Sequence, residues 1–202
     1  MTIVFNATTG ITTPPVSVEG STSGTITLVA PAVAGTNTQT LVATTGTLAP
    51  LILGTAQAST SGTSIDFTGI PSWVERITVM FNGVSTNGSS NVQIQIGAGS
   101  ITTTGYSGGI SQAGASPNQI TLTTGLGITA SNTAALSSTG TAVFSLFGSN
   151  IWVGTSTTSR SDGYGQLGGT VITLSGALDR IRITTVNGTD TFDAGSINIL
   201  YE

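Results

Sequence analysis

The sequence predicts an all-β protein, in which a short β-rich segment is followed by an antiparallel, jelly-roll-like β-sandwich. Only 6% of the residues are charged, against roughly 25% in ordinary soluble domains, whereas Thr, Ser and Gly are abundant. Many short segments alternate apolar and polar residues with a period of two, which is the pattern of half-buried strands. No long segment shows the 3.6-residue period of an amphipathic helix. Val, Ile and Thr also suit a pleated surface.

The first region, residues 1–24, is rich in Thr, Ser, Pro and Gly. It has a short apolar start at Ile3, Val4 and Phe5 and a stiff Pro14-Pro15 pair. Such a segment has no core of its own, so we expect an extended N-terminal arm that serves for attachment.

The second region, residues 25–56, contains two candidate strands. Thr25–Val29 alternates with period two, and Gln39–Val42 begins a strand after a Gly- and Asn-containing turn. The region ends with an apolar cluster of Leu48, Leu51, Ile52 and Leu53. A unit of two or three strands cannot bury its apolar face alone. We therefore expect a β stem that is completed by other copies of the chain.

The third region, residues 57–202, has the length and rhythm of a β-sandwich. The candidate strand Val92–Gly97 alternates cleanly, with Val92, Ile94 and Ile96 on one face and Gln93 and Gln95 on the other. Many short strands without helices favour an antiparallel sandwich. The candidate strands are Ser64–Phe67, Ile77–Asn82, Val92–Gly97, Gln119–Thr123, Ala142–Gly148, Ile151–Thr155, Thr170–Ser175, Ile181–Val186 and Ser196–Tyr201.

Three Asn-Gly pairs are predicted to close hairpins, because both residue types accept the positive φ angles of tight turns. They are Asn82-Gly83, Asn87-Gly88 and Asn187-Gly188. Phe147 and Trp73 lie in or beside apolar runs and are expected to pack in the core.

Two segments are predicted to be long glycine-rich loops, 98–118 and 156–169, and long loops on a rigid sandwich are common binding sites. Their tyrosines are candidates for stacking on a sugar ring, and Trp152 is expected on the outside if Ile151 and Val153 face the core. The candidate receptor-contact residues are Tyr106, Trp152, Arg160, Asp162 and Tyr164. The alternative for each is an ordinary structural role.

The composition excludes several kinds of chemistry. The chain has no His, no Cys and no Lys, so a Ser-His-Asp triad, a cysteine nucleophile, a Schiff base and the common transition-metal sites are ruled out. Paired carboxylates could still hydrolyse glycosides, but the eight acids are scattered, and we expect them to be solvated. Asp190 and Asp193 lie close together, and a calcium site there competes with a role in a turn. We therefore expect neither enzymatic activity nor a cofactor.

Charge and hydrophobicity also limit the partners. The net charge is −4 and the four arginines form no basic cluster, so nucleic-acid binding is not expected. No apolar run approaches the roughly 20 residues that span a bilayer. The start, Met1–Asn6, has no basic segment and no long apolar segment, so we expect no secretory signal.

Three segments resemble a known family, and together they cover well over half of the chain. Gly24–Thr38, followed by Leu41 and Thr45–Leu48, is similar to a recurrent segment of bacteriophage tail-fibre and related virion proteins. Ser64–Met80 and the ending Phe192–Glu202 resemble the C-terminal domain that often follows that segment in fibres of phages and prophages.

The resemblance implies a homotrimer with an N-terminal virion-attachment arm (1–24), an intertwined β stem (25–56) and a β-sandwich head (57–202). It implies a virion protein assembled in the host cytoplasm, with other virion proteins as partners of the arm. From the stem pattern and the aromatic residues of the two predicted loops, we further expect host cell-surface polysaccharide as a ligand of the head. It implies no catalytic residues. Many such fibres carry a much longer shaft before this pair of segments, so a capsid decoration protein without receptor binding stays an alternative, as do a small depolymerase and a non-viral adhesive protein.

Overall fold

The computed structural model describes residues 16–19, 25–28, 50–114 and 116–202, which belong to two separate units, Met1–Thr47 and Leu48–Glu202. In the first unit, β1 (Val16–Glu19) pairs antiparallel with β2 (Thr25–Leu28), and Val16 stands opposite Leu28. The candidate strand Gln39–Val42 and most of the predicted arm and stem lie outside the described residues.

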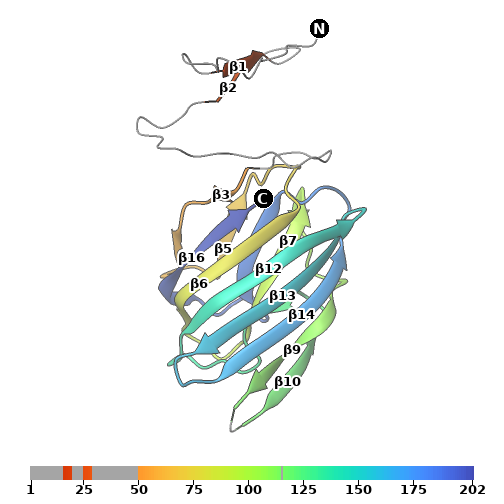
Figure 1. Ribbon diagram of the computed structural model, residues 1–202. Coiled ribbons are helices and arrows are strands. Elements are labelled where there is room, and N and C mark those ends of the chain that lie inside the picture. The colour runs from red at the N-terminus through yellow and green to blue at the C-terminus, as the bar shows by residue number, and fades with distance from the viewer. Residues whose placement is uncertain (1–15, 20–24, 29–49, 115) are drawn as a thin grey trace. The chain divides into compact units, whose positions relative to one another are not determined.

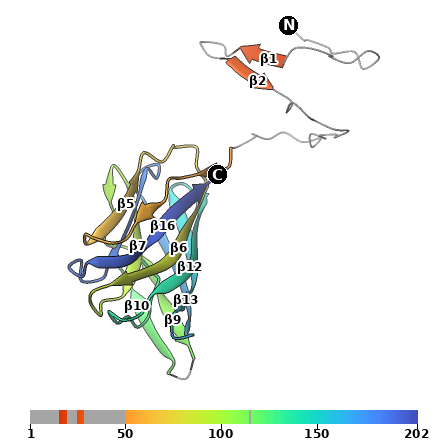
Figure 2. The same ribbon diagram turned by 90° about the vertical axis from the view of Figure 1, so that its left-hand side faces the viewer.

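The second unit is a sandwich of two antiparallel sheets (Figures 1 and 2). The large sheet has the order β10 (Asn118–Leu122), β9 (Ser107–Ala113), β14 (Gly165–Thr173), β13 (Ile151–Arg160), β12 (Ser138–Gly148), β6 (Arg76–Thr86), β16 (Phe192–Tyr201) and β3 (Ile52–Leu53), and β4 (Gln57–Ala58) also pairs with β16. The small sheet has the order β11 (Leu126–Gly127), β7 (Val92–Ala98), β15 (Arg180–Thr185) and β5 (Ser64–Thr68), with β8 (Ser100–Ile101) beside β7. The predicted all-β, antiparallel sandwich is confirmed.

The chain crosses repeatedly between the two sheets. It passes from β5 in the small sheet to β6 in the large one, returns with β7, and enters the large sheet again with β9 and β10. After β11 it forms the meander β12–β13–β14, and β15 and β16 again divide between the sheets. Sequence neighbours therefore stand on opposite sides of one core, which ties the two sheets together.

The core lies between the sheets and comes from alternate positions of long strands. Ile77, Val79 and Phe81 of β6 face Ile94 and Ile96 of β7, and all are buried. The fully buried large side chains elsewhere in this core are Leu126, Ile128, Phe144, Trp152, Ile181, Ile183, Phe192 and Ile197. Apolar burial of this kind is the main stabilising contribution to such a fold.

Two predicted loops are largely strand. The segment 98–118 contains β8 and β9, and the segment 156–169 contains the end of β13 and the start of β14. Only residues 161–164 connect those last two strands. Ser, Thr and Gly carry no apolar alternation, so backbone pairing in these stretches was not visible in the sequence.

The Asn82-Gly83 pair does not close a hairpin. It lies inside β6, where Gly83 has φ of 63° and the pairing with β12 shifts register. Gly195 of β16 lies against it: a Cβ on Gly195 would stand 2.5 Å from the carbonyl oxygen of Gly83. The two glycines form a bulge that accentuates the twist of the sheet. Asn87-Gly88 and Asn187-Gly188 lie in connections between strands. Each connection joins strands of different sheets, β6 to β7 and β15 to β16, so neither pair closes a hairpin and this prediction was wrong.

The domain boundaries differ from the predicted ones in two places. β1 belongs to the predicted arm but pairs with β2 of the predicted stem. β3 belongs to the predicted stem but pairs with β16, with Leu53 opposite Leu200, so the sandwich includes residues before 57.

Two aromatic residues predicted for the core are exposed. Phe147 is 79% exposed near the end of β12, and Trp73 is 41% exposed. Trp73 packs its ring at a tilt on Tyr201, with centroids 6.0 Å apart. The described part of the chain has no helix that is both long and apolar enough to cross a membrane.

Candidate functional site

Tyr106, the first candidate contact residue, is only 3% exposed. Its hydroxyl accepts a hydrogen bond from the main-chain N–H of Ile96 (2.8 Å) and donates to the main-chain oxygen of Thr102 (3.0 Å). Burial raises the pKa of Tyr106 to about 12. The tyrosine therefore fastens the segment before β9 to β7, and the expectation that it stacks on a ligand is corrected.

Trp152 is also buried, with 2% exposure. Val153 is exposed instead, so the strand β13 alternates as predicted but with the opposite face toward the core. Both faces of Ile151–Val153 carry large apolar side chains. The sequence alone therefore could not decide which face of this strand points into the core. The indole Nε1 has no hydrogen-bond partner among the described residues. Trp152 is a core residue.

The remaining three candidates come together in one turn. Arg160 is 8% exposed, and its guanidinium is bonded to both carboxylate oxygens of Asp162 and lies 5.1 Å from the ring centroid of Tyr164. The hydrogen bonds from Arg160 hold the pKa of Asp162 below its ordinary value. Asp162 is exposed and Tyr164 is half-buried, so only these two keep a surface for a partner.

Arg160 belongs to a buried polar cluster, which the sequence reasoning did not predict. Its Nη1 donates to the side-chain oxygen of Gln112 (2.9 Å) and to the main-chain oxygen of Ser131. Gln166 donates to the same oxygen of Gln112 (2.9 Å) and accepts from the main-chain N–H of Ala130 (2.8 Å). Every group has a partner, as buried polar groups require. The cluster therefore holds the segment around residues 130–131 onto the large sheet and is a structural clasp.

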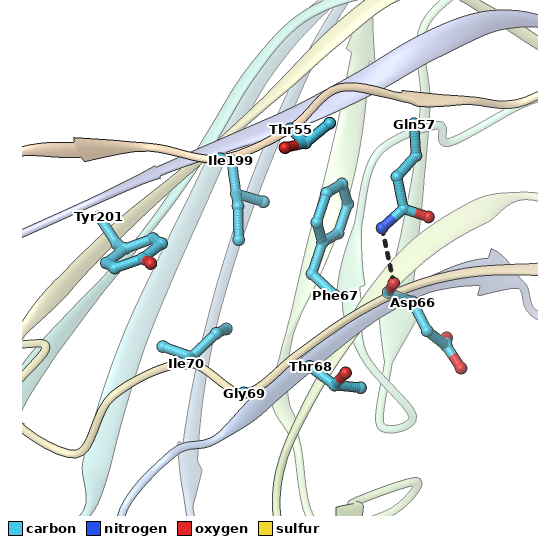
Figure 3. A pocket seen from close by; sticks show the side chains of 10 residues that line it. Thr55, Gln57, Asp66, Phe67, Thr68, Gly69, Ile70, Ile199 and Tyr201 are labelled. Carbon is cyan, nitrogen blue, oxygen red and sulfur yellow. Dashed lines mark hydrogen bonds between the residues drawn. The ribbon is translucent and has the colours of Figure 1, made fainter.

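A cleft of about 260 Å³ opens at one edge of the sandwich, between β4 and β16 on one side and β5 on the other (Figure 3). The side chains of Phe67, Ile70 and Ile199 lie in it. Gln57 closes one end by donating to the main-chain oxygen of Asp66 (2.8 Å). The carboxylate of Asp66 points away from the cleft, as Figure 3 shows, and binds Arg182. The cleft offers no acid–base pair.

Two shallow hollows of about 430 and 450 Å³ lie over the β9–β10 hairpin. Ser111 and Gln119 line both, and Thr121, Asn118 and Pro117 contribute to one or the other. Hydroxyls and amides of this kind can exchange hydrogen bonds with sugar hydroxyls. In both views the hairpin lies at the end of the sandwich remote from β3 and the C-terminus (Figures 1 and 2).

The acids of the sandwich are engaged in local contacts. Asp66 and Asp179 bind Arg182 and Arg180, and Asp190 accepts from Asn187 Nδ2 (2.7 Å) and the N–H of Ser90 (2.9 Å). Hydrogen bonds from these partners lower the pKa of Asp179 and of Asp190, whereas a glycosidase acid needs a raised one. Within the described ranges no group of three potential ligands could hold a metal ion, Asp190 and Asp193 included.

The outward surface of the large sheet forms the uncharged face, defined by alternate residues of five adjacent strands. No charged residue occurs between Arg76 and Arg160 in the sequence, and this stretch supplies β9 and β12 completely and all of β6 and β13 except one terminal arginine each. Its members are Thr78 and Met80 of β6, Thr141, Val143 and Ser145 of β12, Val153, Thr155 and Thr157 of β13, Leu167, Gly169 and Val171 of β14, and Ser107, Gly109 and Ser111 of β9.

No family model, curated protein or solved structure matches this chain.

Proposed function

We propose that the chain is a non-enzymatic structural subunit of a bacteriophage particle. In this proposal it is a short fibre-type homotrimer that is attached by its N-terminal region and presents the sandwich as a host-facing head. The resemblance of residues 24–48, 64–80 and 192–202 to phage fibre proteins supplies the viral context, and the structure supplies the physical support.

The observation that carries the proposal is the pair of β1 and β2, which among the described residues of the first unit are bonded only to each other. A single antiparallel pair of four-residue strands is at best marginally stable in water. Further strands, a partner chain or a helix must cover it. In a symmetric homo-oligomer, each chain can cover the corresponding pair of a neighbouring chain. Copies of the chain are therefore the simplest source of the missing partners.

The second support is the shape of the sandwich. The hollows over β9–β10 and the turn with Asp162 and Tyr164 lie toward the end remote from β3 (Figure 1), and the chain enters the sandwich through β3. A head that is attached through its N-terminal side thus points this polar end outward. Three copies would multiply weak contacts to a surface polysaccharide.

A second candidate function is capsid decoration without receptor binding. It is favoured by the burial of Tyr106, Trp152 and Arg160, which removes three of the five predicted contact residues from the surface. The polysaccharide depolymerase is disfavoured, because the lowered pKa values of Asp179 and Asp190 leave these acids unsuited as proton donors.

The solution mass of the full chain tests the proposal. Light scattering behind size exclusion is expected to give the mass of three chains, unchanged on dilution. A folded protein with the mass of one chain would contradict the homotrimer. Imaging of particles labelled with antibody against this chain then separates the two candidates, because label at the tail supports a fibre and label at the symmetry axes of the capsid supports decoration.

A further inference from the structure

The uncharged face carries more exposed apolar surface than a solvated sheet needs. Val153 is 41% exposed, Leu167 57% and Val171 39%. Val153 stands opposite Val171, and Leu167 lies on the same outward face of β14, four residues before Val171 and opposite Thr157. Leu53 of β3, 62% exposed, extends the same face beyond Leu200. These residues form an apolar surface within rows of Thr and Ser.

The opposite side of the sandwich differs in charge. The outward face of the small sheet carries Asp66 on β5 and Arg182 on β15, which form an ion pair with 2.6 Å between Nη2 and Oδ2. Arg180 follows on the same face. Arg76, where β6 begins, is neutralised by its ion pair with Glu202. The two faces of one sandwich therefore have different compositions, which is expected if they meet different surroundings.

We propose that the uncharged face is the surface through which the head of one chain packs on a second copy of the same chain. This inference rests on the proposed self-association and names the surface that performs it. In a cyclic homotrimer this face of one head meets a different surface of the next head, and a face without charge desolvates no ion of its own in that contact. The proposed occupant is therefore a second copy.

The size of the face fits this role. The five strands of the uncharged face lie about 4.8 Å apart, and three outward positions per strand at about 6.8 Å make roughly 490 Å² in plan. A stable interface buries about 800 Å² per partner. The face can therefore supply most of one such interface. Gly109 and Gly169, opposite each other on β9 and β14, leave the backbone open to close approach.

The test uses single cysteines in the full chain, which has no native Cys. Thr155→Cys places a thiol at the centre of the uncharged face, and Thr68→Cys is the matched control on β5, also an exposed threonine within a strand. If a second copy covers the face, maleimide labels Thr155→Cys at least about tenfold more slowly than Thr68→Cys in the native protein, since interface cores exclude water, and equally fast in denaturant. Thr157→Cys, on the same face, gives the same measurement if Thr155→Cys does not fold.

Each result is read together with the solution mass of the same variant. Equal labelling rates in a protein of three chains overturn this inference and leave the homotrimer intact. Fast labelling at both sites in a protein of one chain overturns both proposals. If Thr155→Cys is labelled slowly in a protein of one chain, something other than a second copy covers the face. The same holds if its labelling becomes slow only after a polysaccharide is added. Either result also overturns the inference.

Discussion

The guanidinium of Arg160 donates a hydrogen bond to the side-chain oxygen of Gln112, 48 positions earlier in the sequence, at 2.9 Å. This contact joins the end of β13 to β9 across the intervening β14. A residue that the sequence offered for receptor contact thus closes the buried polar cluster beneath the large sheet.

The first prediction concerns the strength of this clasp. Arg160→Met is expected to lower the free energy of unfolding by about 2–4 kcal/mol, because Gln112 and the oxygen of Ser131 lose their buried donor. Urea unfolding, followed by circular dichroism at fixed protein concentration, measures the change.

The matched control for this prediction is Arg76→Met. Arg76 also pairs with a carboxylate, Glu202, but its side chain is 55% exposed, so the expected loss is below about 1 kcal/mol. Equal losses for the two variants would show that Arg160 is solvated and that the clasp contributes no stability.

The second prediction concerns alkaline pH. Burial favours neutral Tyr106 and raises its pKa from 10.0 to about 12. The contribution of the neutral, buried Tyr106 to the free energy of unfolding is fully present below pH 10 and is lost as the pH rises through 12. A shift of this size corresponds to about 2.7 kcal/mol. Tyr106→Phe is expected to be less stable at pH 8, because it loses its hydroxyl bonds, but to show a smaller decline between pH 10 and 12. Parallel declines for the two proteins would contradict the assignment.

The third prediction concerns acid. The pKa of Asp190 is lowered from its ordinary value of 3.8, first by the hydrogen bond from Asn187 and then by that from Ser90. A lowered pKa stabilises the fold above the ordinary value, and this stability is lost as the pH falls through the folded-state pKa. Stability is thus expected to be level from pH 7 to 5 and to fall below about 4. Asp190→Asn should weaken this acid dependence, and an unchanged acid profile would show that the Asn187 contact does not persist in solution.

The fourth prediction separates the two tryptophans. In Trp73→Phe the only remaining indole is that of Trp152, which is 2% exposed. Its fluorescence is expected to have a blue-shifted maximum and to resist quenching by acrylamide. The native protein, in which Trp73 is 41% exposed, should be quenched more strongly. Emission of the variant at the wavelength of free tryptophan would place Trp152 outside the core.

The alternation of residue types determined much of the sandwich in advance. Runs such as Val92–Gly97 and Ile181–Val186 alternate apolar and polar residues, and only a strand places such residues on opposite faces. The candidate strands found in this way all lie in or overlap strands of the structure. The sequence analysis missed β9 and the short strands β3, β4, β8 and β11. β9 was missed because Ser, Gly and Gln give no apolar signal, while the backbone pairs regardless of side chain.

The sequence by itself determined that the chain forms antiparallel strands with almost no charge, because these properties follow from local residue types. Only the tertiary structure decided which face of each strand is inside. Trp152 and Val153 are both apolar, and β13 turned the larger one inward because the opposing sheet offers apolar neighbours on that side alone. The same packing drew Tyr106 and Arg160 inside, since their polar atoms found partners in residues far away in the sequence.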